Sequence, residues 1–144
     1  MDRFRGRFIA QVHGPRVLEV GVGTGRNLPL YGPDLQIEAI DFSPRMLDRA
    51  RRTPWPANVT LQLMDVEDLQ FPPGTFDTVV AACVFCSVPD PVQGLREIRR
   101  VLRPDGTALF LEHVRPGDTV ARSRIRPAGP LGVACRSPHQ SAND

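Results

Sequence analysis

The chain has 144 residues, of which 41% are hydrophobic, enough for one domain with a buried core. Its net charge is only +2 and its 18 basic residues are all arginines spread along the chain, which argues against a dedicated nucleic-acid surface. No apolar run is long enough to span a bilayer, and the arginine-rich start lacks the apolar centre of a signal peptide, so we expect a cytoplasmic protein.

Residues 1–14 predict one short amphipathic helix. Its apolar side would consist of Phe4, Phe8, Ile9 and Val12, and the arginines pointing outward would be Arg3, Arg5 and Arg7. Three roles are open for this helix: a lid, a peripheral contact with a membrane surface, or a shortened cap over the domain. We favour the cap.

A glycine-rich loop follows the first predicted strand, residues 16–20, and leads into a predicted short helix at residues 25–31. Gly21, Gly23 and Gly25 have no β-carbon, so a ligand can approach the main chain closely next to a helix N-terminus. Glu19 precedes the first glycine by two residues, and its carboxylate would repel the phosphates of a dinucleotide but attract a cationic ligand.

A second predicted strand, residues 36–40, ends at Asp41, whose carboxylate is placed to accept hydrogen bonds from ribose hydroxyls. The dinucleotide pattern G-x-G-x-x-G fails here, because its third glycine would fall on Arg26, or on Leu28 if counted from Gly23. The loop and the acid together therefore favour S-adenosylmethionine over a nicotinamide cofactor.

The remaining elements alternate between helix and strand, which indicates a parallel sheet with helices on both faces. Ser43-Pro44 opens a helix that Pro54 closes, and Asp90-Pro91 opens another whose apolar face would be Val92, Leu95, Ile98 and Leu102. The other predicted strands are residues 59–63, 77–82 and 107–114.

Five segments within residues 16–115 resemble the class I S-adenosylmethionine-dependent methyltransferases, in that family's order and spacing. They are Glu19 to Gly25, Ala39 to Leu47, Met64 to Pro72, Phe76 to Val80 and Leu102 to Gly106. The resemblance implies an α/β, Rossmann-like doubly wound parallel sheet of strand order 3-2-1-4-5, here without the family's C-terminal antiparallel hairpin. Residues 28–31 and 86–90 look most similar to bacterial ubiquinone and phospholipid methyltransferases.

The resemblance also implies a cofactor site. Its residues would be Glu19, Gly21, Gly23, Gly25, Asp41, Phe42, Met46, Asp65, Val66, Ala82 and Cys83. Glu19 would lie near the methionine part, the glycines would face the ribose and methionine, and Asp41 would hold the ribose hydroxyls. Ala82 and Cys83 would lie beneath the sulfonium.

At the adenine end, the resemblance places Phe42 and Met46 against the ring, with Asp65 and the backbone of Val66 reading the exocyclic amine. Each assignment has a simpler alternative. Asp41 could be only a helix cap and Asp65 only a solvated loop acid, while Phe42 and Met46 could be core residues.

No metal site is expected. Cys83-x-x-Cys86 lacks a nearby second pair or histidines at ligand spacing, so both cysteines are interpreted as small apolar residues at the end of a buried strand. The family shares no catalytic residue, because methyl transfer from a sulfonium requires mainly positioning. His113 is the one histidine placed to act as a base, and a surface or hydrogen-bonded structural role is the simpler interpretation for it.

Beyond Val114 the composition turns to arginine, proline, glycine and serine, which predicts a disordered tail at residues 116–144 after a core of residues 15–115. The fifth strand would then be an exposed apolar edge. A further hypothesis is that the reading frame is shifted from Leu131 onward, which DNA sequencing around Pro130 would test.

Three functions stay open. The first is a methyltransferase acting on a small-molecule or lipid acceptor, with no nucleic-acid partner and an oligomeric state that the sequence leaves open. The second is a noncatalytic remnant that keeps the S-adenosylmethionine pocket. The third, a nicotinamide-dependent oxidoreductase, is disfavoured by the glycine spacing.

Overall fold

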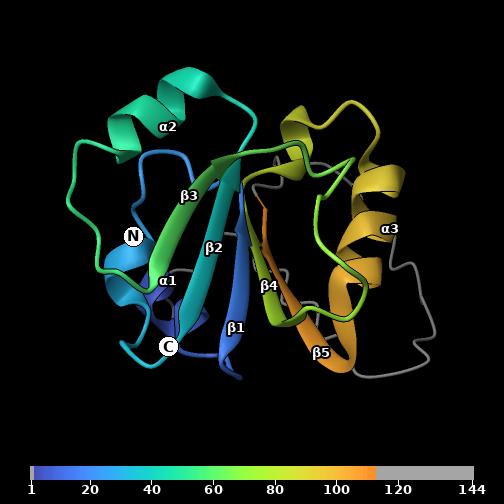
Figure 1. Ribbon diagram of the computed structural model, residues 1–144, viewed down its shortest axis with the longest axis horizontal. Coiled ribbons are helices and arrows are strands. Elements are labelled where there is room, and N and C mark those ends of the chain that lie inside the picture. Colours follow the sequence, from blue (N-terminus) through green and yellow to red (C-terminus); the bar gives the residue numbers. More distant parts are fainter. Residues whose placement is uncertain (1, 113–144) are drawn as a thin grey trace, which may run out of the picture.

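The computed structural model describes residues 2–112 and shows a five-stranded parallel sheet of order β3-β2-β1-β4-β5 (Figure 1). Its strands are β1 (Arg16–Val20), β2 (Gln36–Asp41), β3 (Val59–Leu63), β4 (Phe76–Ala82) and β5 (Leu102–Leu111). The α/β class and the strand order implied by the resemblance are confirmed. His113, the tail at residues 116–144 and the frame-shift hypothesis lie outside the described residues.

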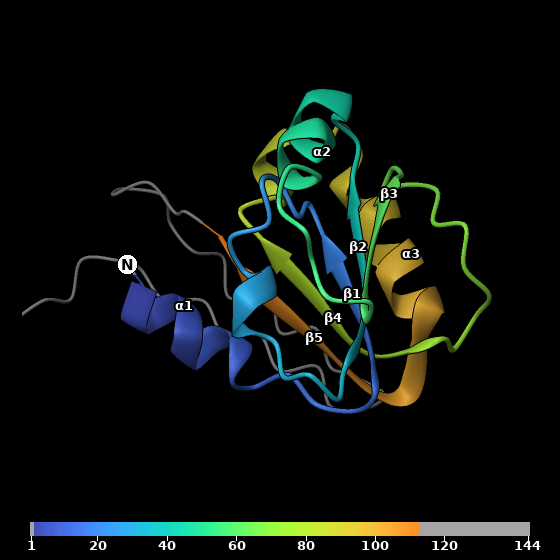
Figure 2. The same cartoon turned by 60° about the vertical axis from the view of Figure 1, so that its left-hand side comes forward.

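Helices lie on both faces of the sheet, with α1 (Asp2–Ile9) on the side opposite α3 (Pro91–Val101) (Figure 2). A third helix, α2 (Pro44–Ala50), follows β2. Within residues 2–112, no helix is both long and apolar enough to cross a membrane.

Alternation along β1 decides which side chains meet which helix. Leu18 packs in the core cluster that contains Ile98 of α3. Val17 packs in the cluster that contains Phe8 and Ile9 of α1. Glu19 shares the face of Val17, so its carboxylate is directed to the α1 side of the sheet.

The starts of α2 and α3 confirm the predictions from Ser43-Pro44 and Asp90-Pro91. The Ser43 hydroxyl accepts a hydrogen bond from the Met46 amide at 3.4 Å, and the Asp90 carboxylate accepts one from the Gln93 amide at 3.1 Å. In both helices a proline follows the cap, where its missing N–H costs no helical hydrogen bond.

The predicted helix at residues 25–31 is wrong in extent. Only a 3₁₀ turn, η1 (Leu28–Leu30), forms there. The Asn27 side chain does not cap this turn, because it bonds to groups elsewhere in the fold, and Pro29 cannot donate to a longer helical ladder. Strand β5 begins at Leu102, earlier than predicted, with an irregularity in its pairing to β4.

The predicted apolar face of α3 is also partly wrong. Val92 and Leu95 are 55% and 43% exposed, whereas Gly94, Ile98 and Val101 are buried. A β-carbon at Gly94 would lie 3.1 Å from the Phe85 ring, so the helix turns its smallest residue toward the segment after β4 and packs closely there.

Candidate functional site

Two neighbouring cavities lie at the carboxyl ends of the strands, where ligands bind in sheets of this type. The large cavity, of about 510 Å³, is bordered by the segments that follow β1, β2, β3 and β4. The small cavity, of about 320 Å³, lies on the α1 side of the glycine loop. Gly21, Gly23 and Met46 border both, so the two cavities adjoin across this loop.

The backbone of the glycine loop has a left-handed conformation that favours glycine, with φ values of 69° at Gly21 and 59° at Gly23. At Gly21 a β-carbon would overlap the Val84 side chain at 2.4 Å. At Gly23 a β-carbon would have no protein atom within 4 Å, although this residue borders both cavities. A side chain at Gly23 would therefore project into the cavity space rather than into the protein.

Gly25 has a different role in the fold. Its φ is 91°, and a β-carbon there would lie 2.6 Å from the Trp55 ring. Gly25 borders neither cavity, so its positive φ and its packing against Trp55 account for the glycine without a ligand. Its assignment to the cofactor stays a prediction.

Asp41 is buried at the end of β2 and joins two parts of the site. Its Oδ2 accepts a hydrogen bond from the Gly23 amide and its Oδ1 accepts one from the Ser43 amide, both at 2.9 Å. Ser43 rather than Asp41 is the N-cap of α2, so the helix-cap interpretation of Asp41 is wrong. Asp41 fixes the glycine loop and also borders the large cavity.

The adenine-side residues predicted from the sequence all border the large cavity. Phe42 is 64% exposed and Met46 is 40% exposed, so the core-packing alternative for both is wrong. Asp65 is exposed and accepts a hydrogen bond from the Glu67 amide at 2.9 Å, while Val66 beside it is buried. The carboxylates of Asp41 and Asp65 thus border this end of the large cavity together with the apolar side chains of Phe42 and Met46.

Glu19 borders the small cavity with only 2% of its surface exposed. Its Oε1 accepts a hydrogen bond from the Asn27 amide at 2.6 Å, whereas Oε2 and the buried Tyr31 hydroxyl lack a hydrogen bond within the described part of the chain. Burial raises the pKa of Glu19 to about 7, against the lowering effects of Asn27, Tyr31 and Arg5. The carboxylate is therefore partly protonated near neutral pH.

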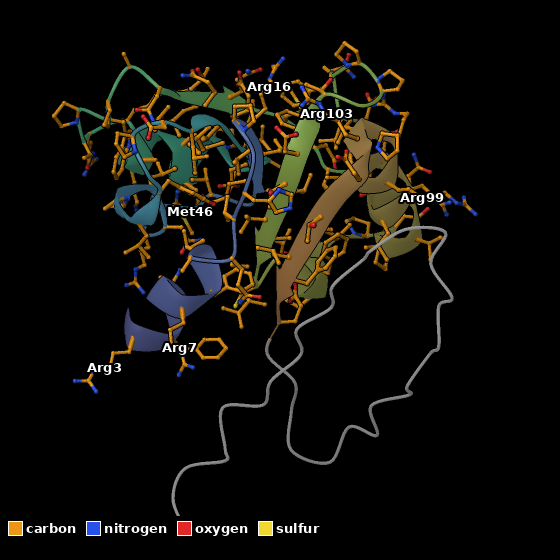
Figure 3. The ribbon with its side chains drawn as sticks, turned by 90° about the horizontal axis from the view of Figure 1, so that it is seen from below. Arg3, Arg7, Arg16, Met46, Arg99 and Arg103 are labelled. Atoms are coloured by element: carbon orange, nitrogen blue, oxygen red, sulfur yellow. The ribbon has the colours of Figure 1, made fainter. Side chains whose placement is uncertain are left out.

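The prediction that Arg5 points outward is wrong. Its Nη1 donates a hydrogen bond to Asn27 Oδ1 at 2.6 Å, and its half-buried side chain borders the small cavity. The reason lies in β1, which directs the Glu19 carboxylate toward α1 and leaves Asn27 between the two charges. Arg3 and Arg7 point away from the body of the protein, as predicted (Figure 3).

Cys83 and Cys86 follow the largely buried strand β4, as predicted, and both side chains are exposed. Cys83 has a φ of 57°, and its thiol pKa is raised, first by partial burial and then by the negative charge of Glu112. The Glu112 carboxylate accepts hydrogen bonds from the Val84 and Phe85 amides, both at 3.1 Å, and so holds the loop after β4. Across residues 2–112, no group of three or more metal-ligating side chains occurs.

Several residues that border the cavities are not among the site residues predicted from the sequence. On the small cavity these are Arg5, Thr24, Arg26 and Asn27, and on the large cavity they include Ser87, Val88 and Pro89. Only the position of the last three after a predicted strand could have placed them near the site, since such loops gather at one edge of a parallel sheet. The inward turn of Arg5 depends on contacts far apart in the chain.

Comparison with known proteins points to one family. Residues 18–110 match the family model described as a methyltransferase domain. The chain is 44% identical over 115 residues to phosphatidylethanolamine N-methyltransferase of Cereibacter sphaeroides, which covers 76% of this chain and 57% of that protein. It is 32% identical over 129 residues to the ubiquinone/menaquinone biosynthesis C-methyltransferase UbiE of Geotalea uraniireducens, covering 84% of this chain and 55% of the relative.

Solved structures agree with these matches. The YcgJ protein of Bacillus subtilis superposes with a TM-score of 0.73 at 27% identity, over 82% of this chain and 53% of that one. The chain therefore spans about half the length of the relatives it matches.

Proposed function

Because the chain belongs to the class I S-adenosylmethionine-dependent methyltransferases, we propose that it binds S-adenosylmethionine across the glycine loop and methylates a small-molecule or lipid acceptor. One observation carries the proposal: at Gly23 the backbone is open to both cavities, and a β-carbon would enter space that no protein atom occupies. A backbone cradle of this kind suits a ligand that extends from one cavity into the other.

The residues present fit this cofactor. Each oxygen of Asp41 accepts one backbone hydrogen bond and keeps acceptor capacity for a ribose hydroxyl, and Asp65 can accept from an amine. The exposed Phe42 and Met46 side chains supply apolar surface for a purine ring. When bound, the cofactor supplies a methyl group on a sulfonium with a good leaving group.

The chain's own part in catalysis is positioning and exclusion of water. Beyond Cys83, the large cavity is bordered by Val84, Ser87, Val88 and Pro89 from the loop after β4. These side chains carry no charge, and the Ser87 hydroxyl donates its hydrogen bond to the Val84 carbonyl at 3.0 Å. A largely apolar acceptor fits this wall better than an ionic one.

The relatives support the same acceptor class. Their names specify phosphatidylethanolamine in one case and ubiquinone or menaquinone biosynthesis in the other. We therefore favour a lipid or quinone-like acceptor that approaches from the loop after β4.

The test of cofactor binding is calorimetric titration of the full chain with S-adenosylhomocysteine, using the variants Gly23→Ala and Gly74→Ala. Both glycines have a positive φ, of 59° and 67°, and neither β-carbon would meet an atom within 4 Å. Each substitution should thus cost about 1 kcal/mol of stability through backbone strain. Only Gly23→Ala should also weaken binding, by about tenfold or more.

Equal affinities in the two variants would contradict the proposed site. Turnover is tested separately, by following a labelled methyl group from S-adenosylmethionine into a panel of quinones, phospholipids and thiols. Binding without transfer to any of them would favour the noncatalytic alternative.

A further inference from the structure

Two thiols lie three residues apart in the loop after β4, and the proposed function requires no chemistry of either one. Cys83 and Cys86 are both exposed and both free. The chain bends at this point into the 3₁₀ turn η2 (Phe85–Ser87), in which the Ser87 amide donates a hydrogen bond to the Val84 carbonyl at 3.1 Å. Two cysteines with this spacing can close a disulfide when a turn brings their side chains together.

The Cys86 side chain is turned back toward Cys83. Its Sγ donates a hydrogen bond to the Cys83 carbonyl oxygen at 3.8 Å. The pKa of the Cys83 thiol is raised by burial, by the negative charge of Glu112 and also by the charge of Cys86. The second sulfur therefore already lies beside the residue to which it would bond.

The two residues between the cysteines are fixed in the fold. The Val84 and Phe85 amides both donate hydrogen bonds to the Glu112 carboxylate at 3.1 Å. Just before them, Cys83 has a φ of 57°, a conformation that residues other than glycine rarely adopt. A disulfide that closes over a fixed spacer is strained, and strained disulfides are the ones that are readily reduced again.

The pair lies at the edge of the large cavity. Cys83 borders this cavity, whereas Cys86 borders neither of the two cavities found among residues 2–112. Val84 packs against the glycine loop, since a β-carbon at Gly21 would lie 2.4 Å from its side chain. A bond between the two sulfurs would therefore draw a side chain away from the cavity and act on the contact between the loop after β4 and the glycine loop.

We propose that Cys83 and Cys86 form a reversible disulfide, with a low-molecular-weight disulfide as the oxidant, and that the oxidised protein binds the cofactor more weakly. The effect on binding rests on the proposed function, but formation of the bond does not. The loop after β4 thus contains a modification site that couples the redox state of the surroundings to the cofactor cavity.

The reaction consists of two thiol–disulfide exchanges. Cys86 reacts first, because the raised pKa of Cys83 leaves little of that thiol ionised. The Cys86 thiolate attacks one sulfur of oxidised glutathione, whose S–S bond breaks and releases one glutathione thiolate. The Cys83 thiolate then attacks the Cys86 sulfur of this mixed disulfide and releases the second. The two protein thiols lose two electrons to glutathione disulfide, and their two protons pass to the released thiolates.

The experiment uses the full chain with Cys135→Ser, because Cys135 is the third cysteine and would also react. After incubation with oxidised glutathione, mass spectrometry should show the loss of two hydrogens without retained glutathione, and thiol titration should show that both free thiols are gone. Calorimetry should then give an affinity for S-adenosylhomocysteine about tenfold lower than that of the reduced protein, the scale of one lost contact. Dithiothreitol should restore it.

Two serine variants in the same background separate the roles of the cysteines. Cys83→Ser should stop at the mixed disulfide between glutathione and Cys86, because the second thiol is missing. Cys86→Ser should acquire glutathione much more slowly, since only the thiol with the raised pKa remains. Its affinity for S-adenosylhomocysteine should stay within about twofold of that of the reduced parent protein, with or without the oxidant.

The outcomes distinguish the inference from the proposed function. Two thiols that survive excess oxidised glutathione, or glutathione retained on both cysteines, overturn the disulfide. A disulfide that forms without changing the affinity overturns its effect on the site. Reduced protein that binds no S-adenosylhomocysteine overturns the proposed function, while mass spectrometry still decides whether the bond forms. If the Cys135→Ser protein does not fold, peptide mapping of the oxidised wild type decides, and a bond to Cys135 instead overturns the inference.

Discussion

Glu19 should make the stability of this protein fall as pH rises from about 4.5 to about 7. Burial raises the pKa of its carboxyl from 4.5 to about 7, so between these values the unfolded chain ionises while the folded chain keeps its proton. Below pH 4.5 both states are protonated and this contribution to stability is complete. It is lost progressively as pH rises from 4.5 to about 7.

The perturbation that tests this is Glu19→Gln, which keeps the shape of the side chain and removes its ionisation. The pKa difference corresponds to about 3 kcal/mol, at about 1.4 kcal/mol for each tenfold change in the equilibrium constant. Glu19→Gln should therefore be more stable than wild type by up to about 3 kcal/mol at pH 8, and close to wild type at pH 4.5.

Urea denaturation at several pH values measures this difference, with the fluorescence of the chain's one tryptophan, Trp55, as the signal. Glu97→Gln is the control, because the contribution of Glu97 to stability should depend on pH in the opposite direction. Hydrogen bonds from Arg100 hold the pKa of Glu97 below its usual value, so its contribution is present above the unfolded-state pKa and is lost as pH falls. A difference between Glu19→Gln and wild type that stays constant from pH 4.5 to pH 8 would refute the reasoning.

Three further substitutions test hydrogen bonds that hold the fold and the loop after β4. Thr78→Val should cost about 1–3 kcal/mol in urea denaturation, because the fully buried hydroxyl donates to the His13 carbonyl at 2.7 Å and accepts from its amide at 3.2 Å. Arg100→Met should cost about 1–2 kcal/mol in the same assay by releasing two carbonyls in residues 69–71, each bonded at 2.7 Å. Glu112→Ala removes the acceptor of two amides in the loop after β4 and should lower the affinity for S-adenosylhomocysteine, measured by calorimetry, about threefold to tenfold. Unchanged affinity would mean that the loop keeps its shape without this carboxylate.

What could be predicted from the sequence is what depends on local chemistry. Ser43 and Asp90 mark helix starts because each caps amides within three residues. Gly21 and Gly23 mark the loop because its backbone requires φ values that other residues rarely adopt. The acids at the strand ends follow from topology, since parallel strands bring their carboxyl ends to one edge.

The wrong predictions concern side chains whose positions depend on contacts with distant parts of the chain. Val92 and Leu95 have helical spacing with Ile98, but the packing of Phe85 selects the glycine side of α3 instead. The helical pattern predicts Arg5 to be exposed, but in the fold its guanidinium donates a hydrogen bond to Asn27, which lies 22 residues away in the chain. Periodicity shows that a helix has an apolar side, but the tertiary contacts decide which residues that side buries.

The contacts of Asp41 limit what its substitution can show. Its carboxylate borders the large cavity and also accepts the hydrogen bond that fixes the Gly23 amide. Asp41→Ala would therefore remove a candidate ribose ligand and release the glycine loop together, and a loss of affinity would have two causes. Gly23→Ala leaves the acid in place and fills only the space above the loop, so it is the sharper test of where the cofactor lies.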